Sequence, residues 1–337
     1  MKIALDLVRE DTPGPKWRGL YRCFWPAYES WYYGEESGER PPRVVAEQSL
    51  RRHMPELMPT YRRLVDLAGG GPQAARFLTL YGPAPYLSGC SQAVWTRGEP
   101  ALVRNYDYSP RLWEAVLLAT AWGDRRVLAM SDCLWGVLDG VNDSGLAVSL
   151  AFGGRKVVGD GFGSPLILRY VLETCDDAAA ARRALGRMST HMAYNITVLD
   201  AGGDHFTAFL APDREAQITT QPFATNHQEG PGWDSYIAAT GSVEREALLA
   251  RHLEGPDTSL EELVALFLRP PLLGSQYQRA MGTLYTAVYY PLRGQVELRW
   301  PNLTVRRSLE DFEESEVVVD LAGVGEGEVV LSPPRPS

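Results

Sequence analysis

The chain has 337 residues, of which 45% are hydrophobic and 22% are charged, and its formal net charge is −9 at pH 7. These values are typical of a globular protein with a large core, arranged as one domain or two. The negative charge and scattered arginines argue against a surface for nucleic acid or anionic membranes, and no apolar stretch is long enough to span a bilayer. Because charges occur as early as Lys2 and Asp6, we expect no signal peptide and a cytoplasmic location.

The cysteines and histidines give no sign of a metal centre or a disulfide framework. The four cysteines lack Cys-x-x-Cys spacing, and the five histidines lack His-x-His and His-Glu-x-x-His spacing. We therefore interpret the cysteines as free thiols, expect three of them to be inert core residues, and expect no metal or other cofactor. The four cysteines are Cys23, Cys90, Cys133 and Cys175.

The first part of the chain is expected to be irregular and then helical. Residues 1–41 are rich in Pro, Gly, Trp and Tyr, which predicts an irregular segment held by aromatic packing. A second interpretation, left open, is that the rings of residues 17–33 line a substrate pocket. Residues 42–80 have apolar side chains three or four positions apart, which is typical of helices.

After Cys90 the pattern changes to short apolar segments separated by turns, which predicts strands. Ser164, Asp177 and Ser259 are expected to cap helices, and Ser259 with Glu262 has the spacing of a capping box. Strands are expected at residues 101–106, 115–121, 127–131, 145–152, 194–199, 205–210, 216–220, 283–290 and 295–300. Helices are expected at residues 166–173, 178–188, 242–253 and 259–268.

This order of elements suggests an α+β protein in which antiparallel sheets are covered by layers of helices, rather than an alternating parallel sheet. We divide the chain into a helical lead-in of residues 1–89, a core of residues 90–310, and an acidic tail of residues 311–337. The tail is expected to fray.

The dipeptide Gly89–Cys90 is the most informative feature of the sequence. The thiol of Cys90 is placed to attack the peptide bond that precedes it, and a break there would make Cys90 the first residue of a new chain. Its α-amine, with a pKa of about 7.7–8.0, would then be a general base beside its own sulfur.

Further motifs follow Cys90 in a characteristic order. They are Ser88-Gly89-Cys90-Ser91, Arg104-Asn105-Tyr106-Asp107, Asp139-Gly140-Val141-Asn142-Asp143-Ser144-Gly145-Leu146-Ala147 and Ala224-Thr225-Asn226-His227. Over residues 42–305 the chain resembles the acyl-coenzyme A:6-aminopenicillanic acid acyltransferase family, whose relatives are choloylglycine hydrolases and penicillin V acylase. The resemblance implies an N-terminal-nucleophile (Ntn) hydrolase with a four-layer αββα fold that acts on a linear amide C–N bond.

The resemblance also implies a role for each matching residue. Cys90 would be the nucleophile, Asp107 would orient the freed α-amine, and Arg104 would favour the thiolate. Asn226 would donate to the oxyanion, and Arg245 matches a later active-site arginine. Read alone, these residues would be a surface ion pair, a turn asparagine and a solvated helix arginine.

Two features of the site are left open by the sequence. Alternation along a strand puts Arg104 and Asp107 on opposite faces, so that both reach Cys90 only if a bulge or a strand end redirects one of them. Residues 149–153 also lack the asparagine that some relatives use as a second oxyanion donor, and a backbone N–H near Phe152 is the alternative.

The sequence therefore predicts an amidohydrolase or acyltransferase that works through a Cys90 thioester after autocatalytic cleavage into residues 1–89 and 90–337. The expected partner is a small amide with an apolar or aromatic acyl group, while homo-oligomerisation stays open. One alternative is an uncleaved Cys90–His227 dyad, with imidazole as the base. The other is a non-catalytic small-molecule-binding protein of the same fold.

Overall fold

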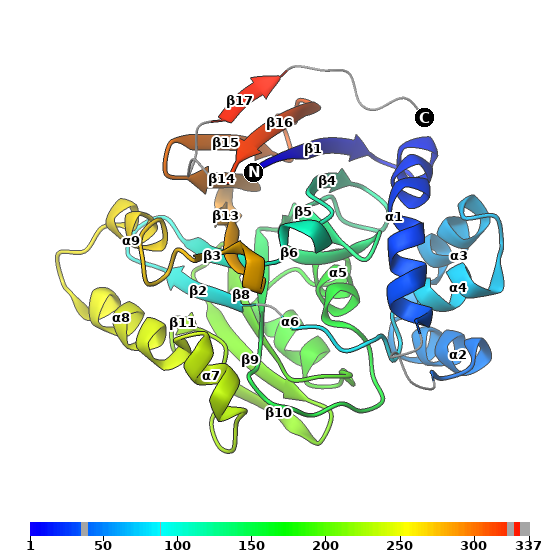
Figure 1. Ribbon diagram of the computed structural model, residues 1–337, viewed down its shortest axis with the longest axis horizontal. Coiled ribbons are helices and arrows are strands. Elements are labelled where there is room, and N and C mark those ends of the chain that lie inside the picture. The colour runs from blue at the N-terminus through cyan, green and yellow to red at the C-terminus, as the bar shows by residue number, and fades with distance from the viewer. Residues whose placement is uncertain (35–39, 88, 322–326, 331–337) are drawn as a thin grey trace.

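The computed structural model describes residues 1–34, 40–87, 89–321 and 327–330, and it has two β-sheets packed face to face between helices (Figure 1). Ser88 and parts of the predicted tail, residues 322–326 and 331–337, lie outside the described residues. Neighbouring strands are antiparallel except for the parallel pair of β1 and β4. In spatial order the larger sheet consists of β10 (Arg214–Thr219), β9 (His205–Ala211), β8 (Tyr194–Asp200), β7 (Leu146–Phe152), β6 (Gly136–Asn142), β5 (Val127–Asp132), β4 (Val116–Thr120), β1 (Lys2–Glu10), β16 (Ser315–Asp320) and β17 (Gly327–Val330).

The smaller sheet carries the predicted nucleophile. Its central strands β2, β3 and β13 are almost completely buried because they are covered on both faces. In spatial order it consists of β11 (Phe223–Ala224), β2 (Gly89–Trp95), β3 (Ala101–Tyr108), β13 (Met281–Tyr290), β14 (Gln295–Trp300) and β15 (Leu303–Ser308), with β12 (Ser275–Gln276) paired to β13.

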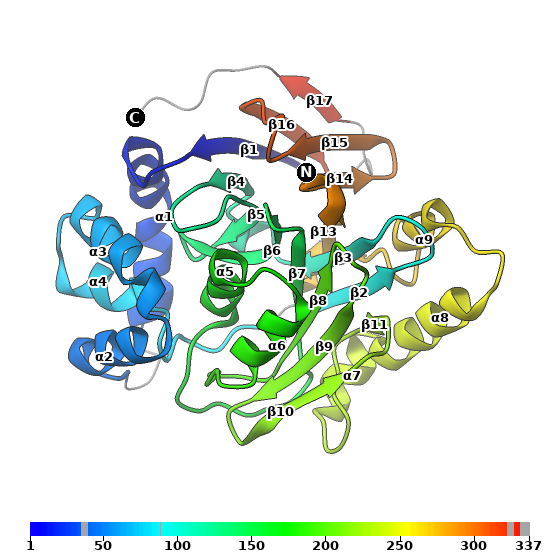
Figure 2. The same ribbon diagram turned by 180° about the vertical axis from the view of Figure 1, so that it is seen from behind.

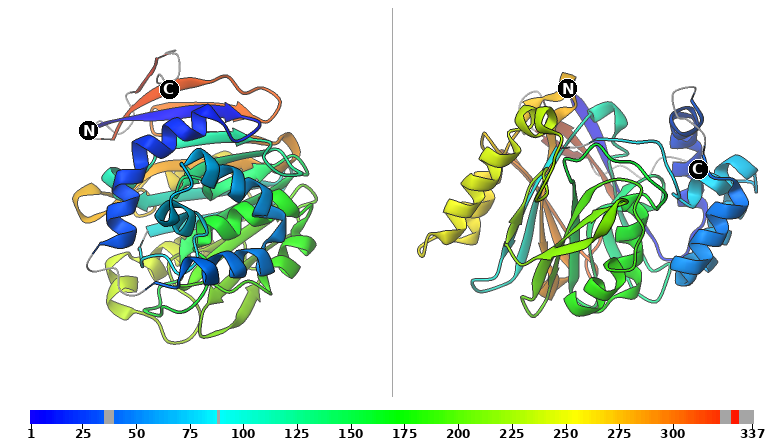
Figure 3. Two further views of the ribbon diagram at one scale, coloured as in Figure 1. Left: turned by 90° about the vertical axis from the view of Figure 1, so that its right-hand side faces the viewer. Right: turned by 90° about the horizontal axis from the view of Figure 1, so that it is seen from below.

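Helices form the outer layers. α8 (Ser242–Glu254) and α9 (Leu260–Phe267) cover the smaller sheet, and α5 (Ser164–Thr174) and α6 (Ala178–Leu185) cover the larger one, as Figures 2 and 3 show. The order of layers is therefore αββα, as the sequence predicts. The short α7 (Asp234–Ala239) precedes α8, and four helices form a group at one side: α1 (Pro15–Tyr33), α2 (Arg43–His53), α3 (Met58–Leu67) and α4 (Pro72–Leu78).

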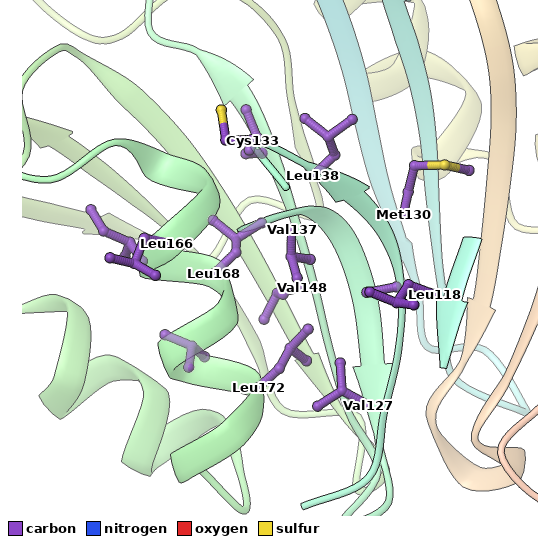
Figure 4. Packing of buried hydrophobic residues seen from close by; sticks show 14 of the residues in the cluster. Leu118, Val127, Met130, Cys133, Val137, Leu138, Val148, Leu166, Leu168 and Leu172 are labelled. Atoms are coloured by element: carbon purple, nitrogen blue, oxygen red, sulfur yellow. The ribbon is translucent and has the colours of Figure 1, made fainter. Parts of the chain in front are cut away.

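Helix α5 packs closely against the larger sheet, and a glycine in the sheet makes this possible. All of α5 except Thr174 is buried, and Figure 4 shows its leucines packed beside valines of β5, β6 and β7. A Cβ on Gly140 would lie 2.9 Å from Leu172 Cδ1 and 2.6 Å from Ala129 Cβ. The absence of a side chain at Gly140 therefore permits the close approach of α5.

The expectation for residues 1–41 is wrong. Residues 2–10 form β1, which lies between β4 and β16, and residues 15–33 form the long helix α1, which begins after Gly14 with Pro15 in its first turn. Trp17, Tyr21 and Trp25 stack at four-residue intervals along α1, with ring centroids 5.5 Å apart. Pro and Gly suggested an irregular segment, but the helical spacing of the rings decides the structure.

Other differences are local. Residues 315–320, which fall in the predicted tail, form β16 beside β1. Strand β6 was not among the expected strands. Gly163, rather than Ser164, precedes α5 as its N-terminal cap residue, whereas the caps at Asp177 and Ser259 form as expected.

Candidate active site

The hairpin of β2 and β3 brings Arg104 to the sulfur of Cys90. Cys90 pairs with Tyr106 and Gln92 pairs with Arg104, so that these four side chains share the face of the smaller sheet that meets the larger one. Arg104 Nη2 lies 3.2 Å from Cys90 Sγ, and both side chains are buried. A guanidinium at this distance stabilises a thiolate relative to a thiol.

The position of Arg104 is fixed by groups from three other strands. Its guanidinium forms an ion pair with Asp139 of β6 and donates to Tyr285 Oη at 3.1 Å and to the Leu150 carbonyl oxygen at 3.0 Å. Burial lowers the pKa of Arg104, but the charges of Cys90, Tyr285 and Asp139 outweigh it, and the pKa lies well above its ordinary value. Arg104 is therefore a permanent, rigidly held cation beside the sulfur.

Asp107 lies on the opposite face of β3, beside Gly89. A Cβ on Gly89 would lie 3.0 Å from Asp107 Cβ and 3.3 Å from its Oδ2, so the glycine leaves room for this close approach. Thr283 donates to Asp107 Oδ1 at 2.6 Å. Burial raises the pKa of Asp107, and the charge of Arg245 and the hydrogen bond from Thr283 oppose this shift.

A register shift in β13 places side chains of this strand on both faces of the β2–β3 hairpin. It lies between Thr283, which pairs with Asp107, and Tyr285, which pairs with Tyr106. In a regular strand these two residues would point the same way, but the shift lets Thr283 bind Asp107 while Tyr285 binds Arg104. The predicted alternation is thus kept in β3, and each side chain reaches the Gly89–Cys90 unit from its own side.

Asn226 and Arg245 hold the backbone of Cys90. Asn226 Oδ1 accepts from the Cys90 N–H and from Arg245 Nη2, both at 2.8 Å. Arg245 Nη1 donates to the Cys90 carbonyl oxygen and to Ser91 Oγ, both at 2.7 Å. The Asn226 amide donates to the Phe152 carbonyl oxygen at 3.1 Å. The structure thus brings all five predicted residues together, and the contact of Asn226 with Cys90 is made by its oxygen.

The chain's class follows from a comparison with known families. A sequence model of the acyl-coenzyme A:6-aminopenicillanic acid acyl-transferase family matches residues 95–304. The chain belongs to this family. It is therefore an Ntn-type amide hydrolase or acyltransferase. The matched range contains Arg104, Asp107, Asn226 and Arg245 but begins after Cys90.

Solved structures similar to the chain share little sequence with it, and no curated protein sequence matches it. A mutant conjugated bile acid hydrolase from Clostridium perfringens has a TM-score of 0.45 and 12% identity, over 73% of this chain and 97% of its own. Penicillin V acylase from Agrobacterium tumefaciens has a TM-score of 0.45 and 13% identity, over 68% of this chain and 91% of its own. The Caenorhabditis elegans ortholog of N-acylethanolamine-hydrolyzing acid amidase has a TM-score of 0.42 and 18% identity, over 60% of this chain and 92% of its own.

His227, the base of the alternative dyad, faces other partners. Its Nδ1 lies 2.9 Å from Ser242 Oγ and 3.3 Å from Thr225 Oγ1, and its Nε2 lies 3.4 Å from Glu246 Oε1. Both ring nitrogens of His227 therefore contact groups other than the Cys90 sulfur.

The sequence indicates the residues around Cys90 but not the residues that fix Arg104 and Asp107 in position. Asp139 belongs to a motif that the family resemblance includes, but nothing in the sequence predicts that it pairs with Arg104 across the two sheets. The contributions of Tyr285 and Thr283 depend on the register shift in β13, for which the sequence has no marker. The residues that the structure describes contain no group of three or more side chains placed to hold a metal ion. None of the helices in the same ranges is long and apolar enough to cross a bilayer.

Proposed function

We propose that Cys90 is the nucleophile of a linear-amide hydrolase or N-acyltransferase and that it becomes the first residue of a new chain by autocatalytic cleavage. The observation that carries this proposal is the contact of 3.2 Å between Cys90 Sγ and the guanidinium of Arg104. A buried thiol gains nucleophilicity only if its anion is stabilised, and a fixed guanidinium provides that stabilisation. The alternative of a non-catalytic binding protein offers no reason to keep a buried cation against this sulfur.

Cleavage of Gly89–Cys90 needs an attacking sulfur and a proton for the departing nitrogen. Cys90 Sγ attacks the Gly89 carbonyl carbon, the C–N bond breaks, and the nitrogen takes up the proton that the thiol loses. The resulting thioester between Gly89 and Cys90 is hydrolysed by water to the Gly89 carboxylate, a free thiol and a free α-amine. The raised pKa of Asp107, which burial causes, suits this carboxyl group to relay that proton beside Gly89.

Catalysis on the substrate repeats the same bond changes. The Cys90 thiolate attacks the amide carbonyl, and the α-amine gives a proton to the departing amine. Water or an acceptor amine then takes the acyl group from the thioester. The hydrogen bond between the Cys90 nitrogen and Asn226 supports a role for Asn226 in positioning this amine, and its amide group remains our candidate for the oxyanion.

A cavity beside Tyr106 supports a substrate with an apolar or aromatic acyl group. It has a volume of about 160 Å³ and is lined by Tyr106, which pairs with Cys90, and by Tyr86, which precedes it in the chain. Phe24, Tyr28 and Trp31 of α1 also line it. This supports the second interpretation of the aromatic residues 17–33, that they contribute to a substrate pocket.

Cys90 itself is 0% exposed, so that an external amide reaches the sulfur only if the groups that cover it move. The intramolecular cut needs no such access and frees the end of the segment that precedes Cys90. We therefore expect cleavage to come before amide turnover, and a cytoplasmic location remains our prediction.

Intact-mass measurement and an amide panel test this proposal together. The purified chain should separate into residues 1–89 and 90–337, and incubation with a reactive arylacyl amide should add one acyl group to the second chain. Cys90→Ala should show neither event. An uncleaved chain with full amidase activity would contradict the proposal.

A further inference from the structure

The cavity beside Tyr106 has a second feature that the proposed chemistry does not use. Its wall contains two carboxyl groups, Glu114 before β4 and Asp132 at the end of β5, together with the Cys133 thiol. The rest of the lining is largely aromatic, and Arg111 and Leu112 lie at its exposed rim. An aromatic cavity with a paired acidic wall is chemically unlike the apolar pocket that an acyl chain alone requires.

The two carboxyl groups are held by a precise set of donors. Tyr28 Oη donates to Glu114 Oε1 at 2.6 Å and lies 3.3 Å from Asp132 Oδ1, so that it joins the pair. Glu114 also accepts from the Leu134 N–H at 2.7 Å and from Ser131 Oγ at 2.8 Å. The acidic wall is therefore rigid, as a preformed binding site requires.

The acidic wall lacks a cation. In the described part of the chain, neither Glu114 nor Asp132 takes part in an ion pair with Lys, Arg or His. Burial, together with the charge of Glu114, raises the pKa of Asp132 to about 7. Burial also raises the pKa of Glu114, although hydrogen bonds from Tyr28, Leu134 and Ser131 oppose the shift. Glu114 is buried and Asp132 is partly buried, and carboxylates with so little access to water are ordinarily paired with a cation.

The backbone at this wall is also strained. Cys133 and Leu134 have φ angles of 54° and 73°, in the left-handed region that residues with a Cβ rarely adopt. The strain aims the Leu134 N–H at Glu114 and the Cys133 N–H at Tyr28 Oη, 2.9 Å away. Strain of this kind is found where a functional geometry must be kept.

An unpartnered donor points to a ligand in the same cavity. Trp113 lines it and is 7% exposed, and its Nε1–H has no hydrogen-bond partner among the described residues. A buried indole N–H usually has an acceptor, because leaving it unpaired is unfavourable. A ligand with an oxygen acceptor would satisfy it.

We propose that this cavity binds a primary or secondary ammonium group carried by a ring-sized part of the ligand, with Glu114 and Asp132 as its counter-charges. The rings of Tyr28, Trp31, Tyr86 and Tyr106 supply faces that attract such a cation. The N–H groups of the ligand's ammonium would donate hydrogen bonds to the two carboxylates. A quaternary ammonium group has no N–H donors and could not form these bonds. The size agrees, since a cavity of about 150 Å³ accommodates benzene.

If the amide substrate occupies this cavity during catalysis, the enzyme selects amides whose part beside Tyr106 carries a protonated amine. That extension rests on the proposed function, whereas binding of the ammonium group itself does not.

Direct titration tests the site without amide turnover. Benzylamine and its neutral counterpart benzyl alcohol are titrated at pH 8 by calorimetry into the full-length protein and into Cys90→Ala. We expect benzylamine to bind both proteins at least about tenfold more tightly than benzyl alcohol. Equal affinities, or tighter binding of phenylacetate than of benzylamine, would overturn the proposal. If benzylamine binds as expected but no chain cleavage or acyl adduct forms, the proposed function fails and the cation site stands.

Variants assign the binding to the acidic wall. Asp132→Asn keeps the size of the side chain and should reduce the preference for benzylamine to below about threefold, while Glu261→Gln, on the exposed surface of α9, should leave it unchanged. An unchanged preference in Asp132→Asn contradicts the proposal.

The role of the Trp113 N–H is tested by a separate binding measurement. Trp113→Phe should weaken phenylalaninamide, which has a carbonyl acceptor beside its ammonium group, more than benzylamine, which has none. Equal losses would show that the Trp113 N–H takes no part in binding.

Discussion

Two buried cysteines of this chain, Cys90 and Cys133, lie in opposite electrostatic surroundings. Cys90 Sγ is 3.2 Å from the Arg104 guanidinium, whereas Cys133 Sγ is 3.5 Å from Asp132 Oδ2. Burial and the charges of Asp132 and Glu114 raise the pKa of the Cys133 thiol well above its ordinary value. The residue type and the burial are the same, so that the sign of the neighbouring charge decides which sulfur can be a nucleophile.

The surrounding clusters differ in the same way. Around Cys90, the carboxylate of Asp139 is matched by Arg104 and by hydrogen bonds from Tyr285 and Tyr289. Around Cys133, two carboxyl groups share one tyrosine, and no ion pair with a residue in the described ranges neutralises them. The carboxylate of the first cluster is neutralised by a cation of the chain, whereas the carboxyl groups of the second would be neutralised by the proposed ligand. This difference is the one we expect between the proposed reaction site and the proposed binding site.

Arg104→Met should have the largest effect, because it removes the cation from the Cys90 cluster. We expect chain cleavage to be lost and the free energy of unfolding to fall by about 3–5 kcal/mol, since Asp139 is left buried without its partner. Chemical denaturation and intact-mass measurement check the two effects. The matched variant Arg104→Met/Asp139→Asn should recover most of the stability but not the cleavage. Cleavage at the normal rate in either variant would contradict the role given to Arg104.

Asp107→Asn tests the other face of the nucleophile strand. It keeps the size of the side chain and the bond to Thr283 but cannot relay a proton, so cleavage of Gly89–Cys90 should slow by about 10²–10⁴-fold. A time course of intact masses after a rapid purification measures the rate. The argument fails if Asp107→Asn cleaves as fast as the unaltered chain.

Asp132→Asn should stabilise the ligand-free protein, in contrast to Arg104→Met. Because the folded-state pKa of Asp132 is raised to about 7 from its usual 3.8, the folded chain binds the extra proton between these values. The contribution of Asp132 to stability therefore falls as pH rises through this window. Burial and the charge of Glu114 make the ionisation of this carboxyl group costly, whereas hydrogen bonds from Cys133 and Tyr28 favour it.

The expected gain from Asp132→Asn is at most about 4 kcal/mol at pH 8, because one unit of pKa shift corresponds to about 1.4 kcal/mol, and it is close to zero at pH 4. Urea unfolding at the two pH values measures it, with Glu261→Gln as the control. A gain that is equal at both pH values would mean that the charge of Asp132 is not the cause.

His227→Gln should have the smallest effect. The ring of His227 contacts Ser242, Thr225 and Glu246, so cleavage and amide turnover should change by less than about threefold. Loss of amide turnover with normal folding would support the dyad in place of the α-amine.

The sequence predicts the placement of Arg104 beside Cys90 well, because that placement is local. A hairpin of two adjacent strands brings Arg104 near Cys90 by alternation alone, and a cap at Asp177 or Ser259 depends on the nearest residues. The family resemblance adds Asn226 and Arg245, which lie far away in the chain.

The rest depends on contacts between distant segments that no local pattern encodes. Tyr28 of α1 meets Glu114 and Asp132 only because β1 enters the larger sheet and carries α1 to its side. The Pro and Gly content of residues 1–41 concealed that helix. The register shift in β13 is likewise a result of how the strands fit, and it decides where Thr283 and Tyr285 point.

Intact-mass measurement on three matched proteins, the unaltered chain, Cys90→Ala and Cys133→Ala, tests the comparison of the two cysteines most directly. Because the cut is intramolecular, it reports on the sulfur without requiring a substrate or solvent access. The account predicts that the unaltered chain and Cys133→Ala separate into residues 1–89 and 90–337, while Cys90→Ala stays whole. Separation of Cys90→Ala at the same bond, or failure of Cys133→Ala to separate while it remains folded, would contradict it.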